Sequence, residues 1–462
     1  MQYKVKLAAI AKNEAAYIPQ WIFHHLSFGF DCIEIWINDT TDNSAELIEK
    51  ISNNHETGKV VFTEADELLK DCISNGLNFQ IEAYSKIFNK TKNTEDYTHI
   101  LFLDLDEFWI PSDFTKSIKD IIANKEYEGA DAISFQWMID APDLARNEFD
   151  RPLKATNLLR KDRHVKTLIK ISHKKTKVLV HNSQIENGEF YLSSGIPFLE
   201  TDPDQHHRSK VPKDYFEETS TQIDESFILH LIHKSQAEYL ASLTRGRSHA
   251  NDNNIFKTNR FGYLPKPENT YINFLVQEEK IQKHEKNFQE FIRQNDISSH
   301  LKTAQLFVYS KFHEALDKLS NNPSLLDQYK QQLQGLKIKD LSNYRIKSNT
   351  ATYYIDIIKL TGNTIDILGW VFDPFSRDPI TLEVTLNTKE EKSIIISKKN
   401  RPDVINIYPD ANLDCGFKIE IILSSKDIAP LTRDELPFKI HAKNNNLYLE
   451  LKTKKKITIN QN

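Results

Sequence analysis

HILFLDLDEFW, residues 99–109, joins an apolar run to three carboxylates, Asp104, Asp106 and Glu107. A continuous apolar run of this length is typical of a strand buried on both faces, as in a parallel sheet. Open α/β sheets bind their ligands at the carboxyl ends of the strands, which is where these acids fall. Because neighbouring carboxylates repel one another, a divalent cation is the simplest partner, and oxygen ligands favour Mg²⁺ or Mn²⁺. A solvated acidic turn after a strand is the alternative interpretation.

Length and composition limit the class of protein. A chain of 462 residues is too long for one ordinary core, so we expect two or three domains. The formal net charge of −5, from 60 basic and 65 acidic residues, gives no support for nucleic-acid binding. Cys32, Cys72 and Cys415 lie far apart without metal-site spacing, which favours a reducing compartment. The chain starts with a predicted strand instead of a signal peptide and has no transmembrane stretch, so we expect a soluble, cytoplasmic protein.

Strand and helix patterns alternate along the first part of the chain. The expected strands are residues 3–11, 33–37, 60–62, 100–103 and 132–137. The expected helices include residues 14–29, a helix capped at 42–44 and an amphipathic helix at 77–90. Alternation of this kind predicts the α/β class, with a parallel sheet and right-handed crossovers.

The pattern changes twice after residue 250. Residues from about 266 to 340 favour helices, and one apolar stripe there predicts core packing: Leu306, Tyr309, Phe312, Leu316 and Leu319. Short alternating segments from about 350 to 458 predict a small antiparallel β-sandwich. We expect Trp370 to be buried in its core, and an exposed indole that stacks on sugar is the alternative. The predicted domains are residues 1–250, a helical extension at 251–345 and a β-sandwich at 346–462.

Polar side chains follow two of the predicted strands and face a third from a helix. Asn13 and Glu14 follow the first strand, and Asp39 follows the second. Gln80 and Tyr84 are four residues apart and therefore share one face of the helix before the acidic strand end. We expect all of them to meet at the carboxyl edge of the sheet, where the strand ends at Asn13 and Asp39 would offer N–H groups and side-chain carbonyls to a base or ribose. Helix capping is the alternative role of Asn13 and Asp39.

Six segments in the same order resemble family 2-type glycosyltransferases, in particular the branch related to family 92. They are IAKNE with IPQWIFHH (residues 10–25), IWINDTTDNS (35–44), QIEAY (80–84), LDLDEF (103–108), VKTLI (165–169) and HLIHKSQAEY with RG (230–246). Together they span roughly residues 7–250. The resemblance therefore rests on an ordered set of motifs and not on the D-x-D sequence alone.

The resemblance implies a GT-A fold, which is a Rossmann-like, mostly parallel sheet, together with a nucleotide-sugar donor and a divalent metal, Mn²⁺ or Mg²⁺. It assigns Asp104 and Asp106 to the metal and the sugar nucleotide, and His230 to the metal shell. The other residues that would hold the nucleotide sugar, expected to be a UDP-sugar, are Asn13, Glu14, Asp39, Gln80 and Tyr84.

The residues on either side of the matched histidine, His230, differ from the family pattern. The family usually carries Asn before this histidine and an aromatic residue after it, whereas this chain has Leu229 and Leu231. His233, three residues further on, is an alternative metal ligand. A histidine buried in the core is the other alternative for His230.

Displacement with inversion requires a group that takes the proton from the acceptor hydroxyl. Glu107 lies nearest the metal cluster, and Asp140 follows the fifth strand, on the side where acceptors approach. We assign the base to Asp140, with Glu107 as the second candidate and a helix cap as the alternative role of Asp140. His181 lies near a histidine of the family and would line the acceptor side.

The C-terminal segment resembles an accessory β-domain of some bacterial surface-polysaccharide glycosyltransferases. The matching segments are LGWVFDP (368–374), RPDV (401–404) and GF (416–417). This resemblance implies a glycan or lipid-linked glycan acceptor in surface polysaccharide or lipopolysaccharide synthesis, and peripheral association with the cytoplasmic face of the inner membrane. The oligomeric state stays open.

Two other classes of protein fit the acidic strand end. Phosphotransferases with a nucleophilic first Asp also use D-x-D, but they normally carry Thr or Val where this chain has Phe108, and on the first strand. The other class is an inactive GT-A scaffold whose β-domain binds glycan. The chain retains Asp104, Asp106, Glu107 and His230, which argues against a loss of catalytic activity.

Overall fold

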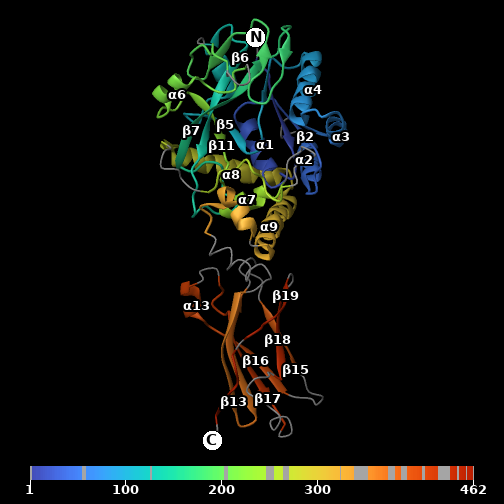
Figure 1. The fold of residues 1–462 in the computed structure, drawn as a ribbon, viewed down its shortest axis with the longest axis vertical. Coiled ribbons are helices and arrows are strands. Elements are labelled where there is room, and N and C mark those ends of the chain that lie inside the picture. Colours follow the sequence, from blue (N-terminus) through green and yellow to red (C-terminus); the bar gives the residue numbers. More distant parts are fainter. Residues whose placement is uncertain are drawn as a thin grey trace. The chain divides into compact units, whose positions relative to one another are not determined.

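The computed structural model divides the chain into two compact units, Met1–Leu336 and Lys337–Asn462 (Figure 1). The structure describes residues 3–54, 59–124, 127–201, 207–245, 254–263, 270–322, 324–337, 352–372, 380–386, 393–407, 411–424, 437–444, 447–453 and 455–460. The helices of the predicted middle segment, 251–345, belong to the first unit as far as residue 336.

A mixed sheet forms the centre of the first unit. Its strands are β1 (Val5–Ala11), β2 (Cys32–Ile37), β3 (Lys59–Glu64), β4 (His99–Phe102), β5 (Glu107–Pro111), β6 (Ala132–Asp140), β7 (Thr156–Lys170), β10 (Phe190–Leu192), β11 (Ser226–His230) and β12 (Ile272–Leu275). The main path through the described strands is β3-β2-β1-β4-β7-β6-β11-β5, with β10 beside β6 and β12 beside β7. A separate hairpin joins β8 (Thr176–Lys177) and β9 (Gln184–Ile185).

Helices connect and cover these strands. They are α1 (Ile18–Ser27), α2 (Ser44–Ser52), α3 (Asp66–Asn75), α4 (Phe79–Thr94), α5 (Ile118–Ile122), α6 (Lys213–Thr219), α7 (Gln236–Leu243), α8 (Glu278–Gln294), α9 (Ser298–Asn321), α10 (Ser324–Gln328) and α11 (Lys330–Leu333). Among the helices described, none combines the length with the apolar composition that crossing a membrane requires.

The predicted α/β class is confirmed. Strands β1 to β4 pair in parallel in the order β3-β2-β1-β4, with helices in the connections between them. The side chains of β2 and β4 are all buried, as their mostly apolar sequences predict, and the acid among them, Glu34, pairs with Lys6 at 2.7 Å. Antiparallel β7 and a further group of strands complete a mostly parallel, Rossmann-like sheet consistent with a GT-A domain.

The sequence prediction missed β5. The acids at 104–107 were expected to end a strand, but Glu107 begins a new, fully buried strand that pairs antiparallel with β11. The register of this pair sets His230 opposite Glu107. A residue remote in sequence is thus brought beside the D-x-D turn, residues 104–106, by backbone pairing.

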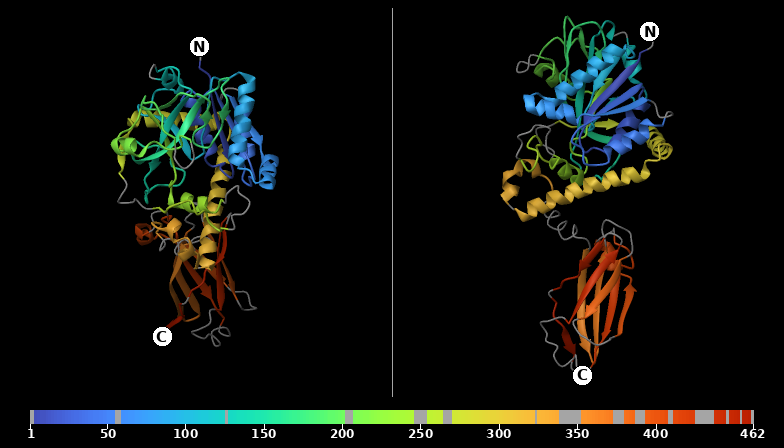
Figure 2. Two further views of the ribbon diagram at one scale, coloured as in Figure 1. Left: turned by 45° about the horizontal axis from the view of Figure 1, so that its top comes forward. Right: turned by 90° about the vertical axis from the view of Figure 1, so that its right-hand side faces the viewer.

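Two apolar layers sandwich the sheet. One layer takes side chains from α1, α2 and α8, including Trp21, Ile48 and Phe288. The other takes side chains from α3 and α4, including Cys72 and Phe88. Figure 2 shows α4, in light blue, lying along its face of the sheet. With both faces covered, ligands reach the sheet only at its edges and strand ends.

Helices α8 and α9 belong to this core. Phe288 and Phe291 of α8 contact Phe23 of α1, with ring centroids 5.4 and 5.6 Å apart. Helix α9 buries the predicted Phe312, Leu316 and Leu319, together with Ala304, Val308 and Ala315. The prediction was wrong for Leu306, which is 58% exposed, because it lies about half a turn away from Ala304 and Val308.

The second unit is a small β-sandwich. One sheet holds β13 (Thr352–Thr361), β14 (Thr364–Phe372), β16 (Ser393–Lys399), β17 (Gly416–Ile422) and β20 (Thr458–Asn460), and the other holds β15 (Thr381–Leu386), β18 (Phe438–Asn444) and β19 (Leu447–Glu450). Both sheets contribute side chains to one core. Trp370 is only half-buried and packs outside this core, beside Phe372 and near the short helix α13 (Pro402–Ile407), because alternation along β14 turns its neighbours inward instead.

Candidate functional site

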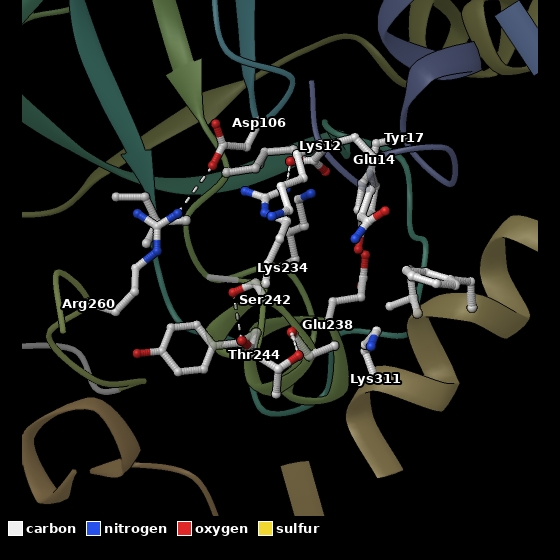
Figure 3. Close-up of a pocket in the computed structure, with 18 of the residues that line it drawn as sticks. Lys12, Glu14, Tyr17, Asp106, Lys234, Glu238, Ser242, Thr244, Arg260 and Lys311 are labelled. Carbon is white, nitrogen blue, oxygen red and sulfur yellow. Dashed lines mark hydrogen bonds and ion pairs between the residues drawn. The ribbon is translucent and has the colours of Figure 1, made fainter. Parts of the chain in front are cut away.

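A pocket of about 240 Å³ opens at the carboxyl ends of β1 and β2, beside the D-x-D turn (Figure 3). Strand order reverses at this point, because β1 pairs with β2 on one side and with β4 on the other. Open α/β sheets bind ligands at such a switch point. The residues that line it include Asp39, Asp106, Lys234, Glu238, Arg260 and, from α9, Phe307 and Lys311.

The loop after β1 supports one wall of the pocket. Asn13 adopts a left-handed backbone conformation with φ of 54°, and its side-chain oxygen accepts the N–H groups of Thr41 at 2.7 Å and Asp42 at 3.2 Å. Asp39 is also left-handed, with φ of 45°, and its carboxylate pairs with Lys12. Asn13 therefore ties two strand-end loops together and caps no helix, and Asp39 lines the pocket.

The pocket lining is rich in cations. Among the described residues that line it, five carry a positive charge: Lys12, Lys234, Arg245, Arg260 and Lys311. Arg245 forms an ion pair with the buried Glu14. The ammonium group of Lys234 lies 3.2 Å from the ring centroid of Tyr17, and burial lowers the pKa of Lys234. Figure 3 shows several of these groups directed into one space, where they can bind an anion such as a diphosphate.

Asp106 is the acid of the D-x-D turn that lines the pocket. One of its oxygens lies 3.3 Å from Arg260 and 3.6 Å from Nε2 of His230. Burial alone would raise the pKa of Asp106, but His230 and Arg260 outweigh it and hold the pKa below its ordinary value. The Asp106 side chain is thus a stable carboxylate at the edge of the cationic pocket.

Asp104 has different partners. Its Oδ1 accepts hydrogen bonds from Gln80 at 3.1 Å and from the Tyr84 hydroxyl at 3.4 Å. Its Oδ2 lies 3.2 Å from the ammonium group of Lys166. The structure therefore brings the predicted α4 pair onto the first acid of the turn, and this group lies outside the lining of the pocket.

Glu107 is fully buried against Lys166. Its Oε2 accepts the Asp104 N–H at 2.8 Å and lies 3.0 Å from the Lys166 ammonium group, whereas its Oε1 is buried without a hydrogen-bond partner among the described residues. Burial raises the pKa of Glu107 to about 7, against the opposing effect of Lys166. Glu107 thus fixes the conformation of the D-x-D turn from beneath.

Asp106 and His230 fit a divalent cation whose remaining ligands a bound substrate would supply. Asp106 and His230 lie 3.6 Å apart, close to the spacing of about 3 Å between adjacent ligand atoms around Mg²⁺ or Mn²⁺. No group of three or more His, Cys, Asp or Glu side chains in the described part of the chain is arranged to hold a metal. Mg²⁺ is commonly held by one or two protein groups together with phosphate oxygens, so two protein ligands beside an anion pocket satisfy this pattern.

Asp140 lies beneath the turn between β11 and α7. Its carboxylate accepts the N–H groups of Ile232 at 2.8 Å, His233 at 3.2 Å and Lys234 at 3.0 Å. Burial alone would raise the pKa of Asp140, but His233 and Arg146 outweigh it and lower the pKa. Asp140 does not line the pocket, and its bonds shape the turn that presents Lys234.

Replacing Asp140 with asparagine should lower the free energy of unfolding by about 2–3 kcal/mol, because three N–H groups lose a charged acceptor. Since the folded-state pKa lies below the unfolded value, this difference should be full above about pH 5 and shrink as the pH falls through the folded pKa. Urea denaturation followed by tryptophan fluorescence measures it. Unchanged stability together with lost turnover would instead support Asp140 as the base.

The two other histidines considered have structural contacts. His233 Nδ1 lies 2.7 Å from the backbone oxygen of Asp140. His181 Nδ1 lies 3.1 Å from the backbone oxygen of Val165, and burial lowers the pKa of His181 to about 3. His181 also contacts Trp137, with ring centroids 5.2 Å apart.

The charged residues Lys166, Arg260 and Lys311 of the site were not identified from the sequence. Lys166 lies inside the apolar segment VKTLI, and a lysine at such a position signals a buried ion pair. Arg260 follows no motif and reaches Asp106 from a loop 154 residues away in sequence. No comparable signal in the sequence identifies Arg260.

Comparisons with known proteins give weak likenesses. No protein-family model matches the chain, and neither does any curated protein. The galactosyltransferase LgtC, solved with donor and acceptor sugar analogues, is 15% identical over 30% of this chain and 47% of its own, with a TM-score of 0.18. An active-site mutant of LgtC is 12% identical over 36% of this chain and 57% of its own, with a TM-score of 0.19. These matches span about half of LgtC.

Proposed function

We propose that the chain is a metal-dependent glycosyltransferase that moves a sugar from a nucleotide-sugar donor to a glycan acceptor. The observation that carries the proposal is a cation-lined pocket at the strand switch point with Asp106 at its edge. A nucleoside diphosphate carries the negative charge that these cations attract. The order of motifs resembling glycosyltransferase families 2 and 92 supports the same assignment.

Different residues of the site would bind different parts of the donor. Lys234, Arg245 and Arg260 would neutralise the diphosphate, and Asp106 with His230 would hold Mn²⁺ or Mg²⁺ against it. When bound, the cation stabilises the negative charge that develops on the departing diphosphate. Asp104, held by Gln80 and Tyr84, would position hydroxyl groups of the donor.

The finer assignment rests on the sequence resemblance. We propose a UDP-sugar as donor, inversion at the anomeric carbon, and an acceptor that is a glycan or lipid-linked glycan of a bacterial surface polysaccharide or lipopolysaccharide. Asn13, Glu14 and Asp39 would then lie along the nucleotide. We also propose that the protein acts at the cytoplasmic face of the inner membrane.

Thermal melting with UDP, GDP, CMP or dTDP, each with and without Mn²⁺, tests the proposal. A nucleotide at about 100 times its Kd adds about 2.7 kcal/mol to the stability of the folded state, which raises the melting temperature by roughly 5 °C. We expect this shift for UDP with Mn²⁺, and its reversal by a chelator. If none of the four nucleotides changes the melting temperature, the inactive scaffold replaces the transferase as the better account.

A further inference from the structure

A β-bulge lies beside His230 on the sheet. The register of β6 against β7 shifts between Gln136 and Met138, so that Trp137 faces residues 162–164 of β7. The bulged stretch bonds to a neighbouring segment instead: the backbone oxygen of Arg163 accepts the Val211 N–H at 2.8 Å. Bulges re-aim side chains and are frequent next to active sites. This one turns Asp162 and His164 towards each other.

Asp162 and His164 form a hydrogen-bonded dyad. Nδ1 of His164 lies 2.7 Å from Oδ1 of Asp162, which also accepts the His164 N–H at 3.1 Å. Arg160 holds the other oxygen of Asp162 at 3.0 Å. An ionised carboxylate only accepts hydrogen bonds, so Nδ1 carries the proton and Nε2 is the basic nitrogen of the ring. The same division of roles orients the catalytic imidazole of serine hydrolases.

The dyad is one indole ring away from the candidate cation ligands. Trp137 stacks on His164 with ring centroids 5.0 Å apart, and it contacts the ring of His230 at 4.3 Å. His230 in turn faces Asp106. The His164 side chain is 34% exposed and that of Asp104 is 38% exposed, whereas the surrounding strands are largely buried. A partly exposed imidazole therefore lies against a half-buried indole.

These features suit a sugar acceptor. One face of a pyranose ring presents C–H groups that pack on an aromatic ring, and its rim presents hydroxyl groups that bond to polar neighbours. Trp137 offers a half-buried aromatic ring, on which His164 stacks and which His181 meets edge-on. An acceptor seated there would direct a hydroxyl towards the position of the donor sugar near Asp106.

We propose that His164, oriented by Asp162, is the general base of the transfer and that Trp137 is the platform for the acceptor sugar. This inference rests on the proposed function. In the step, the acceptor oxygen forms a bond to the anomeric carbon of the donor while the bond from that carbon to the diphosphate oxygen breaks. The hydroxyl proton passes to Nε2 of His164, and the nucleoside diphosphate departs with the electron pair. Water then removes the proton from the imidazole.

The test measures nucleotide release from UDP-glucose, UDP-galactose and UDP-N-acetylglucosamine, with methyl glycosides as acceptors. His164→Gln should lower kcat by about 100-fold or more and leave the melting shift with UDP and Mn²⁺ unchanged. Imidazole added to His164→Ala should restore part of the turnover, which a purely structural role would not allow. Trp137→Ala should raise the acceptor KM by about tenfold, with the UDP shift retained.

His173→Gln is the matched control, because His173 is an exposed histidine that lies beyond the end of β7. It should keep wild-type kcat. A His164→Gln variant that binds UDP and keeps kcat within threefold of the wild type overturns the base assignment alone, as does a loss in His164→Ala that imidazole does not restore. A wild type that binds no nucleotide instead contradicts the proposed function, and this inference with it.

Discussion

Asp106→Asn is expected to lower the rate of sugar transfer by about 10³-fold, because the variant removes charge from the point where the cation and the diphosphate would meet. Asp106 lines the pocket and faces both His230 and Arg260. Asparagine keeps the size of the side chain but leaves the cation with a neutral ligand. The variant should also lose the Mn²⁺-dependent melting shift with UDP.

Two comparisons make this result specific. Asp71→Asn is the control, since Asp71 is an exposed residue of α3 far from the pocket lining, and it should behave as the wild type. Asp104→Asn should cause a smaller loss, because Asp104 lies outside the pocket lining and is held by Gln80 and Tyr84. Transfer by Asp106→Asn at a rate similar to the wild type would refute the assignment of Asp106 to the cation.

The parallel half of the sheet could be predicted because its signals are local. Strands β1, β2 and β4 are mostly apolar segments followed by polar loops, and such segments are typical of buried strands in parallel sheets. Strand β5 could not be predicted in the same way. Its charged first residue, Glu107, is tolerated inside the sheet only because Lys166 comes from a strand some 60 residues later.

The residues of the site that were predicted have local sequence signals, whereas those that were missed depend on contacts between segments remote in sequence. Gln80, Tyr84 and Asp104 were expected to meet because helix periodicity and strand ends place them, and they do meet. Arg260 reaches Asp106 from a loop that has no periodic pattern, so only tertiary structure reveals the pair. Asp140 was chosen because it follows a strand, but three backbone N–H groups occupy its carboxylate.

Lys166→Met is expected to lower the free energy of unfolding of the first unit by about 3–5 kcal/mol, because removing one partner leaves a buried charge uncompensated. Lys166 is fully buried and lies within 3.2 Å of both Asp104 and Glu107. Methionine keeps the length of the side chain, so the loss reports charge more than volume. Urea denaturation followed by tryptophan fluorescence measures it, since four of the five tryptophans lie in this unit.

The double variant Lys166→Met with Glu107→Gln separates charge from packing. With both charges removed, the buried site holds a neutral amide, and we expect the double variant to recover more than half of the stability that Lys166→Met loses.

Burial already raises the pKa of Glu107 to about 7, and loss of Lys166 should raise it further. An acid with a raised folded-state pKa stabilises the fold below its unfolded pKa of about 4.3 and loses this effect as the pH rises. The deficit of the single variant relative to the double variant should therefore be small near pH 4 and grow towards pH 8. A deficit that stays constant with pH would mean that Lys166 acts through its packing and not through its charge.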